Sequence, residues 1–182
     1  MYHSQLSITA FLTFLALPLS VSSQTVYLIR HGEKPSDGSN GLSALGLERA
    51  QCLRTVFGND SVYDIKYIMA MRPKKNGERT RPRDTVQPLA TDLDITVDIS
   101  CDRDDADCVA NVVNQYEGEG NILISWQHGA LTDIVKALGD ENAPKWKKHA
   151  YDTIWTDPKP YTGLTEMTSE NCPGLDDNQK WT

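Results

Sequence analysis

Two histidines, each followed by a glycine, come directly after segments that are typical of buried strands. His31 follows residues 25–29 and Arg30, and His128 follows residues 121–126 and Gln127. A basic segment, residues 72–83, leads into a predicted helix. A neutral imidazole is a competent nucleophile, and arginine side chains bind the oxygens of an anionic group. The combination therefore indicates phosphoryl transfer, with one histidine as the nucleophile and arginines on the phosphoryl oxygens.

The elements that must position these residues alternate along the chain. The apolar patterns predict strands at residues 25–29, 65–70, 95–99, 121–126, 153–155 and 161–167. They predict helices at residues 42–56, 82–93, 105–116 and 129–138. Such alternation is typical of an α/β fold with a mainly parallel sheet covered by helices on both faces. Because the carboxyl ends of parallel strands meet at one edge, both histidines are expected at that edge.

The length and charge limit the classes of function. The chain has 182 residues, with 18 Lys and Arg against 25 Asp and Glu, and a formal net charge of −7. This length predicts a single domain, since domains commonly have about 100–200 residues. The acidic balance argues against nucleic-acid binding, which needs clustered cations on one face. A small anionic substrate is still compatible with it, because a few arginines can bind one locally.

The first 23 residues are predicted to be a signal peptide. Residues 6–19 are mostly apolar, and no Asp, Glu, Lys or Arg precedes Arg30. This apolar segment is shorter than the ~20 residues of a membrane span, and small residues precede the expected cleavage between Ser23 and Gln24. The alternative is a buried N-terminal helix. The signal peptide predicts a secreted protein, free of the membrane after cleavage, with one domain over residues 24–182.

Secretion also affects how the cysteines and one asparagine are interpreted. The chain has four cysteines, an even number that favours disulfides in an oxidising compartment. Three connectivities are possible, and we prefer Cys101–Cys108 with Cys52–Cys172. A zinc site is disfavoured because the chain has no close Cys-x-x-Cys pair. Asn59 lies in an Asn-Asp-Ser glycosylation sequon within a predicted exposed turn.

Four segments resemble, in order, motifs of the histidine phosphatase superfamily, the phosphoglycerate-mutase-like proteins. They are residues 26–33 (Val-Tyr-Leu-Ile-Arg-His-Gly-Glu), 42–50 (Leu-Ser-Ala-Leu-Gly-Leu-Glu-Arg-Ala), 80–85 (Thr-Arg-Pro-Arg-Asp-Thr) and 122–129 (Ile-Leu-Ile-Ser-Trp-Gln-His-Gly). They extend from residue 26 to residue 129 of the expected mature chain. The Trp-x-His-Gly form of the last motif resembles small secreted members of fungal type.

The resemblance implies a three-layer α/β/α sandwich and hydrolysis of a small phosphorylated substrate. His31 would attack phosphorus and form a phosphohistidine, Arg30 and Arg81 would bind the phosphoryl oxygens, and His128 would donate a hydrogen bond to them. No metal or other cofactor is expected. Arg72 and Arg83 are rivals of Arg81 for its position. A catalytically silent secreted binding protein, effector-like and with the same fold, is the alternative function. The oligomeric state is left open.

The proton donor to the leaving group is the point where the sequence departs from the family. Acid phosphatases of the family have an Asp directly after the second histidine, where this chain has Gly129. Mutase-like members use a carboxylate after the third strand, a region occupied here by residues 102–105. We expect Asp104 to be the donor, which would require a raised carboxyl pKa. Its rivals are Asp102, Asp105 and Glu33, and a helix-capping role is the competing interpretation of Asp104 and Asp105.

Overall fold

A computed structural model describes residues 24–176, so the predicted signal peptide lies outside the described residues. The described chain runs β1 (Thr25–Arg30), α1 (Ala44–Val56), β2 (Ile65–Ala70), α2 (Arg81–Asp92), α3 (Ala106–Gln115), β3 (Asn121–Trp126), α4 (His128–Leu138), β4 (Thr153–Pro158) and β5 (Glu166–Ser169). Ser43 caps α1 by accepting a hydrogen bond from the backbone N–H of Gly46, as expected for a serine before a helix. Gly139 ends α4 with a positive φ of 141°.

The strands form one mixed sheet in the order β2-β3-β1-β4-β5. Strands β2, β3 and β1 are parallel neighbours, while β4 and β5 continue the sheet with antiparallel pairing. In the register of the central strands, Leu28 of β1 pairs with Ile124 of β3. The carboxyl ends of β1 and β3 therefore lie side by side, and these are the ends that lead into His31 and His128.

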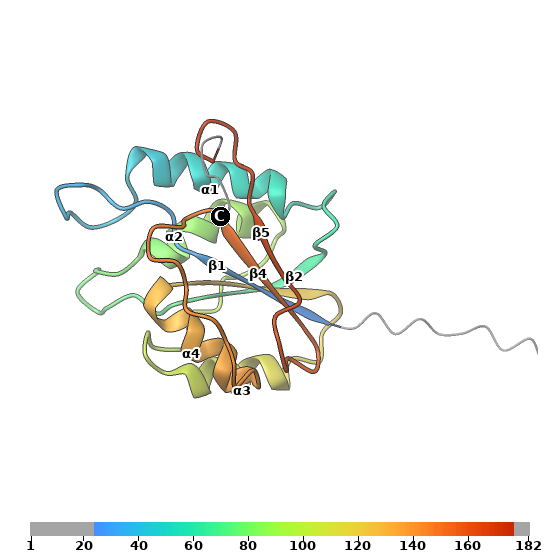
Figure 1. Ribbon diagram of the computed structural model, residues 1–182. Coiled ribbons are helices and arrows are strands. Elements are labelled where there is room, and N and C mark those ends of the chain that lie inside the picture. Colours follow the sequence, from blue (N-terminus) through green and yellow to red (C-terminus); the bar gives the residue numbers. More distant parts are fainter. Residues whose placement is uncertain (1–23, 177–182) are drawn as a thin grey trace, which may run out of the picture.

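Helices cover both faces of the sheet, as Figure 1 shows, with α1 and α2 on one side and α3 and α4 on the other. Side chains of β1 alternate between the two faces. Val26 and Leu28 pack in the core under α3 and α4, whereas Ile29 packs with α1 and α2. The predicted α/β sandwich with parallel central strands is confirmed.

The strand predicted at residues 95–99 is not formed. Only Asp98 pairs with β2, where its N–H donates to the carbonyl of Ile68 and its carbonyl accepts from the N–H of Ala70. Asp94, just before the segment, has a positive φ of 54°, and beyond the bridge a backbone hydrogen bond follows, from the N–H of Arg72 to the carbonyl of Cys101. The alternating apolar residues Ile95, Val97 and Ile99 pack against the core, although the segment does not pair as a strand.

The strand predicted at residues 161–167 is displaced toward the C-terminus. Tyr161 has a positive φ of 66°, so it belongs to a turn, and pairing with β4 begins at Glu166. The ring of Tyr161 is buried, and its hydroxyl donates to the side chain of Gln24. The apolar pattern that predicts a strand at residues 161–167 therefore begins with a residue that is buried in a turn.

Two disulfides connect the cysteines in the pairing preferred from the sequence. Cys52 of α1 is bonded to Cys172, and Cys101 is bonded to Cys108 in the first turn of α3. The first joins residues 120 positions apart, and the second closes a short loop of separation 7. Asn59 is exposed just after α1. Among the described residues, no helix has the length and apolar character needed to span a membrane.

Candidate active site

His31 is a buried imidazole whose tautomer is set by the backbone. The residue lies directly after β1 and is only 5% exposed, and its backbone N–H donates to the carbonyl of Trp126 in β3. Its Nδ1 lies 2.7 Å from the carbonyl oxygen of Gly32. Because a carbonyl oxygen only accepts, Nδ1 must carry the proton. Nε2 is then left with its lone pair, which is the state a nucleophile requires.

The surroundings keep this imidazole neutral. Burial is the main cause that lowers the pKa of His31, to about 4, and the charges of Arg30, Arg81 and His128 lower it further. The hydrogen bond to Gly32 opposes these effects only in part. At neutral pH the ring is therefore unprotonated at Nε2.

We expect His31 to titrate near pH 4 and not near 6.5, the ordinary value for histidine. Protonation blocks Nε2, so kcat/KM for a phosphomonoester, corrected for the ionisation of the substrate itself, should hold from pH 7 down to about pH 5 and fall as the pH drops toward 4. Proton NMR titration of the free enzyme checks the pKa directly, with the His31 resonance assigned by its absence in His31→Asn. A His31 resonance titrating near 6.5 would contradict the expectation.

A buried threonine joins the nucleophile segment to helix α2. The backbone N–H of Gly32 donates to Oγ1 of Thr85 at 2.8 Å, and this hydroxyl donates to the carbonyl oxygen of Arg81 at 2.7 Å. On the other side, Gly46 of α1 lies so close that a Cβ there would be 2.5 Å from the carbonyl oxygen of Glu33. Close packing between α1 and the segment after His31 thus requires a glycine at this position.

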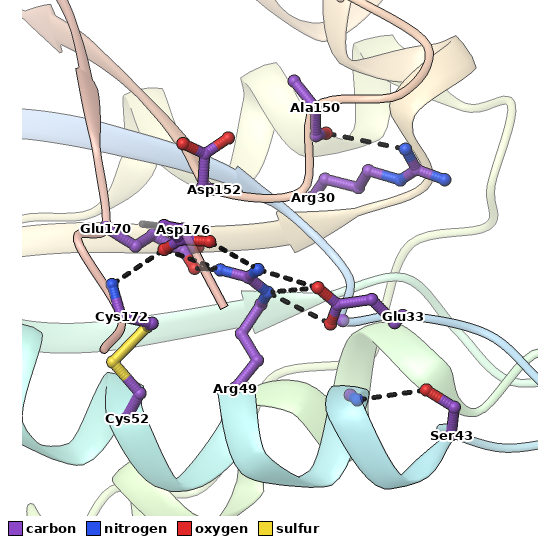
Figure 2. Close-up of polar contacts among 12 residues, drawn as sticks. Arg30, Glu33, Ser43, Arg49, Cys52, Ala150, Asp152, Glu170, Cys172 and Asp176 are labelled. Atoms are coloured by element: carbon purple, nitrogen blue, oxygen red, sulfur yellow. Dashed lines mark hydrogen bonds and ion pairs between the residues drawn. A yellow bond between two sulfur atoms is a disulfide. The ribbon is translucent and has the colours of Figure 1, made fainter. Parts of the chain in front are cut away.

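Arg30 is fixed by the loop before β4. Its Nη1 donates to the carbonyl oxygen of Lys148 at 2.6 Å and approaches that of Ala150 at 3.5 Å, the contact drawn in Figure 2. Its guanidinium also lies over the ring of Tyr151, 3.6 Å from the centroid. Burial lowers the pKa of Arg30, but a guanidinium stays charged in proteins. Its buried Nε has no hydrogen-bond partner among the described residues.

A pocket of about 210 Å³ lies at His31 and is lined mainly by cationic and polar side chains. Its lining residues are His31, Met71, Arg79, Arg81, Pro82, Arg103 and Gln127. Arg81 is the first residue of α2, at the positive end of the helix dipole. Three arginines beside a neutral imidazole form a site suited to an anion.

Two of these arginines, Arg79 and Arg103, are not among the residues predicted for the site. Arg72 and Arg83, the rivals of Arg81 for the second phosphate-binding position, do not line the pocket. Arg72 forms an exposed pair with Asp102, and Arg83 forms a half-buried pair with Asp84. Arg81 is therefore the one of the three candidates that the structure places beside His31.

His128 begins α4, which is capped by the side chain of Gln127. It lines a neighbouring cavity of about 370 Å³ with Trp146 and α4 residues, not the pocket of His31 itself. Burial lowers the pKa of His128, and the charges of Arg30 and Lys148 lower it further. Its charge in turn acts on His31, so the two histidines are electrostatic neighbours. The structure thus gathers all four predicted residues at one edge of the sheet.

The geometry does not support Asp104 as the proton donor. Its carboxylate forms two hydrogen bonds with Arg103, at 2.6 and 2.7 Å, and its side chain is 68% exposed. Hydrogen bonding from Arg103 lowers the pKa of Asp104, the opposite of what a general acid needs. Asp105 caps α3 by accepting from the N–H of Cys108. The helix-capping interpretation therefore holds for Asp105.

The carboxylates of Asp102 and Glu33 are also engaged away from the pocket. Asp102 pairs with Arg72, and Glu33 accepts three hydrogen bonds from Arg49. Among the residues that the structure describes, no carboxylate lines the pocket of His31. Leaving groups that need protonation would find no carboxylic acid there.

Arg49 is the centre of a buried charge cluster that no sequence motif indicates. Its guanidinium is 1% exposed and binds the carboxylates of Glu33, Glu170 and Asp176 at 2.6–2.8 Å (Figure 2). Burial raises the pKa of Glu170 to about 8, and the charges of Asp176 and Glu33 add to this, although Arg49 opposes it. Glu33 is two residues after His31, so the cluster anchors the nucleophile segment.

Part of this cluster also has the composition of a metal site. Glu170, Cys172 and Asp176 are the one group of three potential ligands found in residues 24–176. The sulfur of Cys172 is used in the disulfide with Cys52, and both carboxylates bind Arg49. The donors are therefore already committed, and the group is better explained as a salt-bridge cluster.

The same fold occurs in solved structures of histidine phosphatases. No family model matches the chain, and no curated protein matches it. The protein histidine phosphatase SixA in complex with tungstate is similar, with 13% identity, a TM-score of 0.58, and coverage of 81% of this chain and 97% of that chain. A phosphoserine phosphatase variant from Entamoeba histolytica, in complex with phosphoserine, has 14% identity, a TM-score of 0.54, and coverage of 82% and 99%. The chain thus has the fold of these phosphatases.

Proposed function

We propose that the chain is a phosphatase that hydrolyses small phosphomonoesters through a phosphohistidine on His31. The observation that carries the proposal is the tautomer of His31. Its Nδ1 is bound to the carbonyl of Gly32, which leaves the lone pair of Nε2 for an arginine-lined pocket. The fold is shared with a phosphoserine phosphatase and a protein histidine phosphatase, which supports a phosphorylated substrate.

In the proposed reaction, Nε2 of His31 attacks phosphorus as the bond between phosphorus and the leaving oxygen breaks. A phosphoramidate forms, and Arg30 and Arg81 bind its oxygens. His128, at the start of α4, donates a hydrogen bond to them when its ring is oriented toward the phosphoryl group. Water then attacks phosphorus, the N–P bond breaks, and inorganic phosphate leaves with His31 restored. The cationic side chains supply the charge stabilisation, so this proposal needs no metal.

The lack of a carboxylate in the described pocket predicts a strong dependence on the leaving group. We expect p-nitrophenyl phosphate, whose leaving group needs little protonation, to react about 10²-fold or more faster than an alkyl phosphate, the usual range for an absent general acid. Initial rates for a series of phosphomonoesters measure this dependence as a slope, that of the logarithm of the rate against the pKa of the leaving group. Asp104→Asn should leave the slope unchanged. A steeper slope in that variant would restore Asp104 as the proton donor.

The cellular setting is part of the same proposal. We propose a secreted protein of the small fungal type, with residues 1–23 as its signal peptide and residues 24–182 as the mature domain. Two disulfides and an exposed Asn59 in a glycosylation sequon support an extracellular location. The net charge of −7 supports a small substrate and not nucleic acid.

The function is tested by assaying the unreduced protein on a panel of phosphomonoesters, with and without EDTA. Release of phosphate that is unaffected by EDTA is expected. Loss of activity on EDTA treatment would indicate a metal enzyme instead. Binding of inorganic phosphate without any turnover would favour the catalytically silent binding protein.

A further inference from the structure

We propose that Arg79 and Arg103 form a second anion subsite beside His31, so that the preferred substrate carries a carboxylate or second phosphate on its leaving group. This inference rests on the proposed phosphatase function. Two cavities meet at these arginines. One is the pocket of His31, and the other, of about 250 Å³, contains Arg72, Lys74 and residues 102–105. Arg79 and Arg103 line both.

Arg79 is a cation held in place by its backbone, with no described partner for its side chain. It has a positive φ of 62°, which is unusual for a residue with a side chain. The side chain of Asn40 fixes this segment, because it accepts from the N–H of Arg79 and donates to the carbonyl of Gly77. No hydrogen bond or ion pair engages its guanidinium within residues 24–176. A strained residue that presents an unpaired cation to a pocket is typical of a binding site.

Arg103 is positioned by two constraints on its loop. The indole N–H of the fully buried Trp126 donates to its carbonyl oxygen at 2.9 Å. The loop itself is closed by the Cys101–Cys108 disulfide, and Cys101 accepts a backbone hydrogen bond from Arg72 at 3.0 Å. The backbone that carries Arg103 is therefore tied to β3 and to the segment after β2. Such preorganisation favours ligand binding.

The carboxylate that now binds Arg103 can be replaced. Asp104 is largely exposed, and an exposed ion pair contributes little to stability. The other two acidic residues of the second cavity have partners other than Arg79 and Arg103, since Asp102 forms an exposed pair with Arg72 and Asp105 caps α3. An incoming anion would therefore meet the guanidinium of Arg79, which has no hydrogen bond or ion pair among the described residues, and would compete with Asp104, whose carboxylate binds Arg103 and also feels the charge of Arg79.

The direction of the leaving group follows from the roles proposed for the other arginines. Arg30 and Arg81 bind the transferred phosphoryl group, so neither is available for a second anion. Arg79 and Arg103 continue from the same pocket into the second cavity. A leaving group that extends into this cavity places its own anionic substituent against the two arginines.

The test compares two substrates that differ in charge, meta-carboxyphenyl phosphate and meta-carbamoylphenyl phosphate. The measured quantity is the ratio of kcat/KM for the acid over the amide, in the wild type and in variants. A third substrate, meta-phosphonophenyl phosphate, distinguishes a carboxylate from a phosphate preference. Because every variant is measured on the same pair, intrinsic differences in reactivity cancel.

We expect Arg79→Gln to lower the ratio by about tenfold or more, as for the loss of a charge-assisted hydrogen bond. Lys75→Gln is the matched control: it removes the same charge from the same loop, but Lys75 is exposed and lines neither cavity. Its ratio should stay within about twofold of wild type, as for a surface charge. Asp104→Asn should raise the ratio, since it removes the competing carboxylate.

Equal ratios in Arg79→Gln and Lys75→Gln, with turnover of both substrates intact, would overturn the subsite and leave the phosphatase function standing. An unchanged or lower ratio in Asp104→Asn would also overturn it. Absence of turnover with every substrate in the wild type would overturn the proposed function and the subsite together.

Discussion

His31→Ala is expected to lower phosphatase turnover by about 10⁴-fold or more, as when a catalytic nucleophile is removed. The physical reason is that no other described side chain in the pocket offers a neutral nitrogen lone pair. Rapid quenching of the wild-type reaction should also trap a phosphoenzyme that is stable in alkali and labile in acid. Steady-state rates and phosphoenzyme yield measure the two effects.

His149→Ala is the matched control for this loss. It also removes an imidazole, but His149 is exposed and lines none of the cavities described at the site. Its rate should stay near that of the wild type. His31→Asn retains a polar side chain of similar size, so it separates loss of the nucleophile from misfolding if the alanine variant does not fold. Turnover by a folded His31 variant at the wild-type level would refute the assignment.

Arg49→Met should destabilise the protein by about 3–5 kcal/mol, because it removes the buried cation that pairs with three carboxylates. Glu33, Glu170 and Asp176 would be left buried without their counter-charge. Chemical denaturation of the unreduced protein measures the free energy of unfolding. The loss should diminish at low pH, where protonation neutralises the carboxylates left behind.

Arg54→Met tests whether this effect is specific to burial. Arg54 is on the same helix and pairs with Asp92, but their side chains are 45% and 36% exposed. An exposed pair of this kind contributes about 0–1 kcal/mol, so little change is expected. Equal destabilisation by the two substitutions would mean that the Arg49 cluster has no special role.

Local pattern is sufficient to predict the elements that carry the nucleophile. The β-branched and aromatic residues before Arg30 form β1, and Ser43 caps α1 as expected. Local pattern fails at residues 95–99, where an alternation typical of a strand packs against the core with one bridge to β2. The difference lies in the backbone, because the apolar side chains of residues 95–99 pack against the core while only Asp98 of this segment forms a bridge with β2.

The parts of the site that sequence patterns miss depend on contacts distant in sequence. A single arginine on a helix is normally exposed, so nothing local indicates that Arg49 is buried with residues 170 and 176. A basic loop residue such as Arg79 is normally solvated, and only its fixed backbone and the shared cavities indicate a binding role. The prediction of Asp104 rests on its place after a predicted strand, yet its neighbour Arg103 neutralises it.

The closure of the Arg49 cluster has a consequence for biosynthesis. Chains are made from the N-terminus at roughly 5–20 residues per second, so Arg49 leaves the ribosome well before Glu170 and Asp176. Until residues 170–176 emerge, α1 lacks two of the three carboxylates that neutralise its buried guanidinium and also lacks the sulfur partner of Cys52. The nascent chain can form β1, β2 and β3, but the nucleophile segment gains its full anchor only when this late segment arrives. The Arg49 cluster can therefore close only after residues 170–176 have been made, and the Cys52–Cys172 disulfide then links this late segment covalently to α1.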